Sequence, residues 1–162
     1  MRNSGLLKAI LGVCFAILCV LSVLSSRAAT AVEDMPYRTA DGLAVYLGVV
    51  PAEIVKGHPP GHPEQAMHGG APKGPHQYHV VVAVFDSASG NRISDATVTA
   101  QVSGLGLSGS KVKLEPMEIA GTISYGGFFN LPGRDLYTVR LTIERTGAGR
   151  ATVMDLRYDH RR

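Results

Sequence analysis

Apolar and polar residues alternate along several short segments of this chain. In the segment 136–144, Tyr137, Val139, Leu141 and Ile143 alternate with polar or charged neighbours, and the segments 96–103 and 152–159 repeat the pattern. A period of two places successive side chains on opposite faces of an extended chain, so each segment predicts a half-buried antiparallel strand. With other runs rich in β-branched and aromatic residues, the pattern predicts seven strands: 43–50, 78–85, 96–102, 112–117, 122–129, 136–144 and 151–158.

The segments between these strands have the composition of turns, as in Ser89-Gly90-Asn91 and Leu131-Pro132-Gly133. After residue 31, no window of ten or more residues shows a helical period free of glycine and proline. Short strands separated by turns predict an all-β fold, an immunoglobulin-like antiparallel β-sandwich of about seven strands. Residues 133–137 resemble the start of a late strand in immunoglobulin-like folds, where a tyrosine, here Tyr137, packs or hydrogen-bonds at a corner.

The predicted strand 78–85 differs from the others because both of its faces are apolar. Such a strand lies centrally in its sheet and is covered on its outer side. The segment before it, residues 51–77, is rich in histidine, proline and glycine and is too long for an ordinary connection. A loop of this length is typically either functional or disordered, and it is the natural cover for the strand.

The amino-terminal residues have the pattern of a secretory signal peptide. Arg2 and Lys8 supply a positive start, residues 9–24 are nearly all apolar, and small residues follow Arg27. The apolar run is shorter than the roughly 20 residues that a spanning helix needs, and the whole pattern is typical of a cleaved leader. We expect residues 1–31 to be removed and residues 32–162 to form one domain in the periplasm. An uncleaved amino-terminal anchor is the alternative.

The charge and the cysteine content change once this leader is set aside. The chain has 16 basic and 13 acidic residues, but three of the basic residues and none of the acidic ones lie in residues 1–31. Residues 32–162 therefore carry 13 of each sign, and a net charge near zero gives no electrostatic reason to bind nucleic acid. Cys14 and Cys19 also lie in the leader. The remaining chain has neither a disulfide nor a thiolate metal ligand, so its stability must come from an apolar core.

Five of the six histidines lie between residues 58 and 79, together with Met67. Imidazole is the commonest protein ligand for metals and a thioether favours soft ions, so this set suits copper better than zinc. We take His68, His76 and Met67 in the loop, and His79 at the start of the strand, as candidate ligands. Two alternatives stay open for the tract: adventitious binding in no single geometry, and a solvated spacer with no metal role. For His79 the alternative is a hydrogen-bonded edge residue.

A second group of motifs lies later in the chain. Pro116-Met117 ends a predicted strand, Tyr125-Gly126 follows, and the strand 136–144 comes next. With Tyr78-His79 at the start of the long strand, this order resembles the periplasmic β-sandwich proteins associated with bacterial iron uptake, which bind copper. The resemblance covers residues 78–144.

The resemblance implies copper as the bound metal, with His79 and Met117 as ligands. It also shows two departures: Val81 stands where the family has an acidic residue, and Ser124 stands where the family has a histidine. The loop residues would then have to complete the set of ligands by folding over the strand, or the site is a structural relic. The alternative for Met117 is a methionine that fills a gap in the core.

The sequence lacks the common catalytic motifs. After residue 31 there is no cysteine nucleophile, and we find no Gly-x-Ser-x-Gly turn, Gly-rich phosphate loop or His-Glu-x-x-His helix. Asp86 and Asp95 lie at turns, where aspartate hydrogen-bonds locally. His160 lies close to the last residue, and we expect this end of the chain to be frayed.

We therefore expect a periplasmic protein that is not an enzyme and binds metal, most simply in copper capture and transfer or as an accessory to iron uptake. Its expected partners are a metal ion and either an envelope membrane protein or a second copy of itself, without nucleic acid. The alternative is an immunoglobulin-like interaction module of an envelope complex, with no specific metal site.

Overall fold

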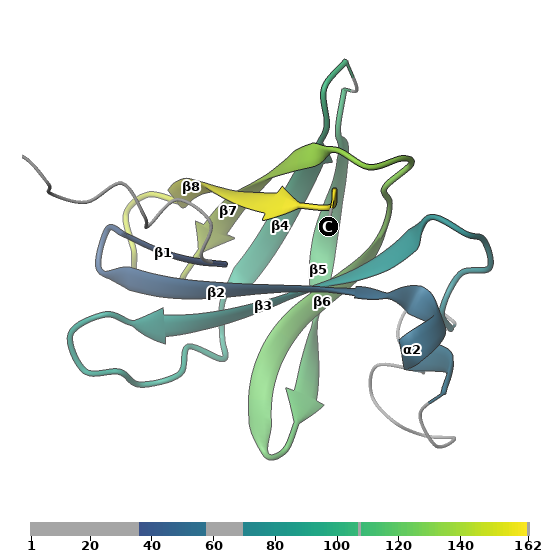
Figure 1. Ribbon diagram of the computed structural model, residues 1–162. Helices are drawn as coiled ribbons and strands as arrows, with labels where there is room; N and C mark the ends of the chain where they lie inside the picture. The colour runs from purple at the N-terminus through teal and green to yellow at the C-terminus, as the bar shows by residue number, and fades with distance from the viewer. Residues whose placement is uncertain (1–35, 58–69, 107, 162) are drawn as a thin grey trace, which may run out of the picture. The chain divides into compact units, whose positions relative to one another are not determined.

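The computed structural model describes residues 36–57, 70–106 and 108–161, and this part of the chain consists of strands and one short helix (Figure 1). The elements are β1 (Tyr37–Ala40), β2 (Leu43–Pro51), α2 (Ala52–Lys56), β3 (Gln77–Asp86), β4 (Thr97–Ser103), β5 (Ser110–Ile119), β6 (Thr122–Asn130), β7 (Leu136–Glu144) and β8 (Thr152–Asp159). All seven predicted strands are present, and their ends lie within one or two residues of the prediction. The predicted leader, residues 1–31, lies outside the described residues. Among the described residues, the structure contains no helix with the length and hydrophobicity of a membrane span.

The strands form one antiparallel sheet with the order β1-β2-β3-β6-β5-β4-β7-β8. Strand β5 joins its two halves, because Ser110–Leu114 pair with β4 and Glu115–Ile119 pair with β6. The sheet curls until the edge strands β1 and β8 contact each other, so its form is nearly a barrel. The predicted all-β antiparallel class is confirmed. The finer prediction of a two-sheet sandwich is not, because β5 makes the sheet continuous.

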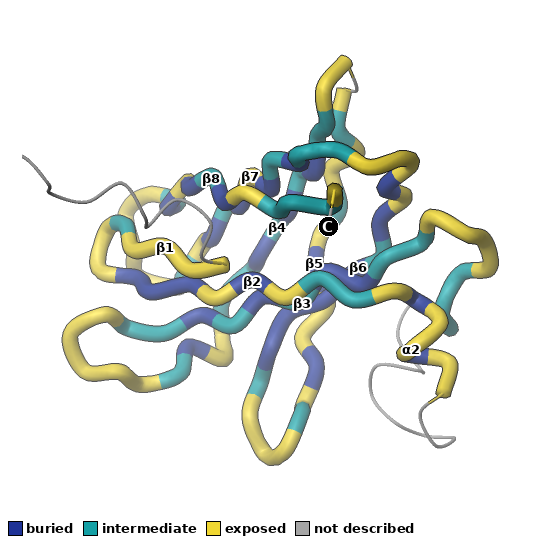
Figure 2. Tube along the Cα trace, viewed as in Figure 1, coloured by how far each residue is buried: buried dark blue, intermediate teal, exposed yellow. Residues whose placement is uncertain are grey.

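The core lies on the concave side of this sheet, and the buried stretches of the strands follow it (Figure 2). The predicted inward faces are confirmed: Tyr137, Val139, Leu141 and Ile143 of β7 are at most 1 % exposed. Every second residue of such a strand buries its apolar side chain. Full burial of one aliphatic side chain contributes about 1.5–3 kcal/mol to the free energy of folding. The other core residues from the predicted strands include Val80, Val82, Val84, Val98, Ala100, Leu114, Tyr125, Met154 and Leu156.

Two residues singled out at strand ends make the expected local hydrogen bonds. The Tyr137 hydroxyl donates to the Pro132 carbonyl at 2.6 Å, which confirms the corner tyrosine. The Asp86 carboxylate accepts hydrogen bonds from the backbone N–H and the hydroxyl of Ser89, both at 2.8 Å. These bonds, with the backbone bond the larger cause, lower the pKa of Asp86.

The segment predicted as a loop over residues 51–77 begins and ends in regular structure. Pro51 is the last residue of β2, residues 52–56 form α2, and Gln77 opens β3. Helix α2 buries Ala52 and Val55 and packs against β3. Neither residue belongs to the main core. The helix therefore packs beside β3 outside the main core.

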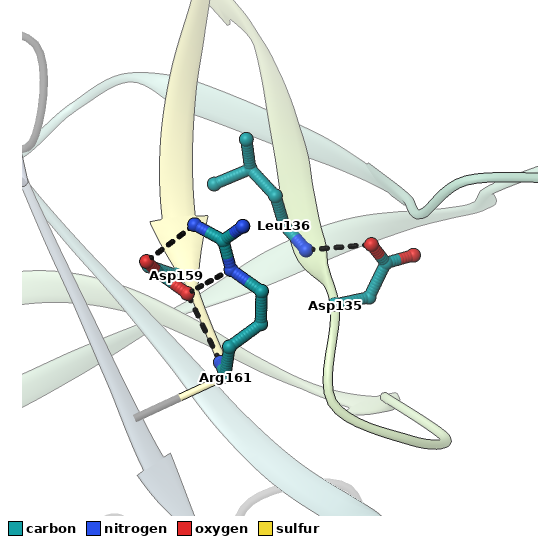
Figure 3. Close-up of polar contacts among 4 residues, drawn as sticks. All are labelled: Asp135, Leu136, Asp159 and Arg161. Atoms are coloured by element: carbon teal, nitrogen blue, oxygen red, sulfur yellow. Dashed lines mark hydrogen bonds and ion pairs between the residues drawn. The ribbon is translucent and has the colours of Figure 1, made fainter.

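The prediction of a frayed carboxyl end is wrong for His160 and Arg161. The His160 ring nitrogen Nε2 is 2.8 Å from the Tyr78 hydroxyl, and the His160 backbone N–H donates to the Asp135 carbonyl. Arg161 then forms two side-chain hydrogen bonds with the Asp159 carboxylate, while the Asp135 carboxylate accepts one from the backbone N–H of Leu136 (Figure 3). The end of β8 is thus fixed to the starts of β3 and β7.

Candidate metal centre

His79 lies on the face of β3 that is turned away from the main core. Val80, Val82 and Val84 are core residues, and side chains alternate along a strand, so His79 and Val81 belong to the opposite face. The His79 side chain is nevertheless completely buried, and so are both of its ring nitrogens. Because β3 lies between β2 and β6, His79 is not a residue of a sheet edge.

Met117 lies on the same face of the sheet, on the other side of β6. It pairs with Ser124 of β6, whereas His79 pairs with Phe128 of the same strand. Met117 is only 3 % exposed, yet it is not a member of the main core. It therefore does not fill a gap there.

Gly126 provides the space in which these two side chains meet. It lies midway between Ser124 and Phe128 on the same face of β6. A Cβ atom at Gly126 would be 2.6 Å from His79 Nε2, 2.6 Å from Met117 Cε and 3.0 Å from Met117 Sδ. The separation of Nε2 and Sδ is at most the sum of the distances from that common point. The structure thus brings together an imidazole nitrogen and a thioether sulfur from two distant segments of the chain.

Both side chains of this pair are buried, and an aromatic ring lies beside the imidazole. The ring of His79 lies 4.9 Å from the ring of Phe128, centroid to centroid, at an angle of 33°. Helix α2 packs beside β3, and its residues Ala52 and Val55 are at most 1 % exposed. The burial of both residues keeps bulk water from the two donor atoms and lowers the local dielectric constant.

Within the described residues, the structure does not bring any of the other three predicted ligands, His76, Met67 and His68, to this pair. His76 is exposed in the turn before β3, and its carbonyl accepts a hydrogen bond from the Leu131 N–H at 2.8 Å. Met67 and His68 lie outside the described residues. Within the described ranges, no three His, Cys, Asp or Glu side chains are grouped so that they could hold a metal ion. The described part of the candidate site is therefore a pair of donors, one nitrogen and one sulfur.

The two departures from the family pattern lie at the same place. Val81 pairs with Gly126 from the β3 side, and Ser124 pairs with Met117. Both residues belong to the face that carries His79 and Met117. The four positions that the resemblance singles out therefore surround one glycine, although two of them carry side chains that are poor ligands.

Sequence reasoning missed the role of Gly126 as the space between the two ligands and the helical form of residues 52–56, within the segment that it placed over the strand. The signal for the glycine was present, because a glycine inside a predicted strand often marks a close approach by another group. A helix of five residues after a proline gives no comparable signal, since its apolar pattern is shorter than two turns.

The fold is similar to that of several bacterial proteins of known structure. A copper-bound variant of FetP from uropathogenic Escherichia coli, with glutamine in place of one glutamate, has a TM-score of 0.59 and 13% identity over 78% of this chain and 94% of that chain. A copper-bound variant of Campylobacter jejuni P19, with isoleucine in place of one methionine, has a TM-score of 0.57 and 10% identity over 79% and 96%. A DUF4426 family protein from Pseudomonas aeruginosa has a TM-score of 0.53 and 17% identity over 76% and 94%.

No protein-family model matches this chain, and no curated protein matches it in sequence. The suspected resemblance is confirmed as a shared fold, because FetP and P19 are among its structural neighbours.

Proposed function

We propose that this protein is a periplasmic copper-binding protein that captures the ion and passes it to a partner, without catalysing a reaction. The observation that carries the proposal is the meeting of His79 Nε2 and Met117 Sδ above Gly126. Imidazole and thioether are the donor types that copper accepts together, and no cysteine is needed.

The structural neighbours support the choice of metal. The similar structures include copper-bound variants of FetP and of P19, which share the fold. This chain also keeps a histidine and a methionine at the positions to which the family resemblance points. A role as an accessory to iron uptake rests on that resemblance alone.

The amino-terminal pattern and the neighbours support the periplasm as the location. Residues 1–31 have the composition of a cleaved leader, and FetP was expressed in the periplasm of E. coli for one of the similar structures. In the capture step, His79 and Met117 would hold the ion on the sheet. Met67, His68 and His76 are the candidates to complete the set of donors.

Titration of the purified protein with copper tests the proposal. We expect one copper ion per chain, bound to the wild type at least about tenfold more tightly than to Met117→Leu, which keeps the side-chain volume and removes the sulfur. His79→Leu should weaken binding as strongly. Circular dichroism and thermal unfolding establish that each variant is folded.

The matched control is Met154→Leu, because Met154 is a buried methionine of the main core. It should leave copper binding as it is. Weak binding of several ions per chain, unchanged by Met117→Leu, would reject the proposal and favour the interaction module.

A further inference from the structure

The donor set around Gly126 is neutral. One imidazole and one thioether approach the glycine, and the neighbouring positions on the same face are the alkyl group of Val81 and the hydroxyl of Ser124. Neither Val81 nor Ser124 carries a charge to balance that of a bound cation. Imidazole in its metal-binding form and thioether are uncharged as well.

The strand register places one carboxylate residue, Glu115, opposite Gly126. Glu115 pairs with Gly126 from the β5 side, and its residue is exposed, in contrast to the buried Met117. It therefore stands at the solvent side of the site. In the described part of the chain there is no group of three His, Cys, Asp or Glu side chains that could take a hard divalent ion.

The burial of the donors adds a cost that depends on charge. His79 is 0 % exposed and Met117 is 3 % exposed, with Phe128 beside the imidazole ring. The Born energy of moving an ion out of water rises with the square of its charge, so a divalent ion pays about four times as much as a monovalent ion of equal size. Without a carboxylate, nothing in this pair of donors offsets that difference.

From this we propose that the site is selective for the soft monovalent ions Cu(I) and Ag(I) and discriminates against Cu(II) and Zn(II). The inference rests on the proposed function and names the class of ion. Thioether sulfur prefers soft ions.

The test compares ions on the same purified protein. Silver nitrate serves as a redox-inert probe for the monovalent class, Cu(I) is added anaerobically in competition with a chelator, and Cu(II) and Zn(II) form separate arms. We expect Ag(I) and Cu(I) to bind at one equivalent, at least about tenfold more tightly than either divalent ion. Met117→Leu should remove this preference.

Two further substitutions, one that adds a carboxylate to the site and one that removes a carboxylate beside it, test the role of charge. Val81→Glu introduces a carboxylate beside Gly126 and should raise the affinity for Cu(II) at least about tenfold, whereas its neutral partner Val81→Gln should not. Glu115→Gln should leave Ag(I) binding unchanged. Thermal unfolding shows whether each variant is folded before its affinity is compared.

The outcomes separate the two proposals. If Cu(II) binds the wild type as tightly as Ag(I), at one equivalent and with loss in Met117→Leu, the copper function stands and the selectivity for monovalent ions is overturned. If no ion binds in a way that depends on Met117, the proposed function itself fails. If Glu115→Gln lowers Ag(I) affinity at least about tenfold, a carboxylate takes part and the neutral site is overturned.

Discussion

At the scale of single residues, the candidate site depends on the absence of a side chain at Gly126. We predict that Gly126→Ala destabilises the protein by about 1–3 kcal/mol, the usual cost of overpacking. The new methyl group would lie 2.6 Å from His79 Nε2 and 2.6 Å from Met117 Cε, so the two side chains must move apart. Urea unfolding measures the loss, and the copper titration should show at least about tenfold weaker binding.

The matched control for this substitution is Gly48→Ala. Gly48 lies on the same face of the sheet and pairs with Val81, but the nearest atoms to an added Cβ there are 3.9 Å away. This variant should have the same free energy of unfolding and the same copper affinity as the wild type. Equal effects of the two substitutions would mean that the cost comes from the backbone and not from the contact with His79 and Met117.

At the scale of elements, the seven strands of seven to ten residues could be predicted because several of them repeat a period of two, and the others are rich in β-branched and aromatic residues. Strand β1 was missed because its four residues, Tyr-Arg-Thr-Ala, are exposed or half-buried, so no apolar stripe marks them. Helix α2 was missed because five residues cannot show a helical period. Neither element therefore has a hydrophobic pattern by which it could be recognised in the sequence.

The end of β8 is the other element that the sequence did not reveal. His160 lies in an aromatic cluster, with its ring centroid 4.7 Å from that of Tyr78 and 5.7 Å from that of Tyr158. These partners come from β3 and β8, and the contact with β3 spans more than half of the described chain. Reasoning from the sequence position of a residue near the end of a chain therefore gave the wrong result.

We predict that His160→Ala destabilises the protein by about 1–3 kcal/mol, since it removes a hydrogen bond and buried ring contacts. Tyr78→Phe removes only the hydroxyl and should cost about 1 kcal/mol. The exposed His76→Ala is the control and should change the free energy of unfolding by less than about 0.5 kcal/mol. Chemical unfolding gives these values. A wild-type stability in His160→Ala would show that the His160 side chain contributes nothing to the stability of the fold.

At the scale of the whole molecule, the candidate site could be predicted only in part. The residue types of His79 and Met117, and their places at a strand start and a strand end, are visible in the sequence. Their meeting depends on the sheet order β3-β6-β5, in which β5 leaves β4 to pair with β6 halfway along its length. No local pattern encodes that change of partner, because it depends on contacts between segments far apart in the chain.

The buried tyrosines make the stability of the whole fold depend on pH in the alkaline range. Burial is the largest cause that raises the pKa of Tyr125, Tyr137 and Tyr158. The ordinary value for tyrosine is about 10. In the folded protein these groups keep their protons to higher pH than in the unfolded chain. Their contribution to stability is therefore complete below about pH 10 and is lost as the pH rises toward their raised pKa values.

We predict that the free energy of unfolding is constant with respect to these groups from pH 8 to about pH 10 and falls above it. Urea unfolding at a series of pH values measures the fall, and tyrosinate absorbance follows the ionisation itself. Tyr125→Phe should make the fall less steep, because Tyr125 accepts a hydrogen bond from the Ala96 N–H and donates one to the Ile93 carbonyl only while it is protonated. The exposed Tyr46→Phe is the matched control and should leave the slope as it is. Stability that rises above pH 10 would contradict the prediction, since it would mean that the folded protein releases these protons more easily than the unfolded chain.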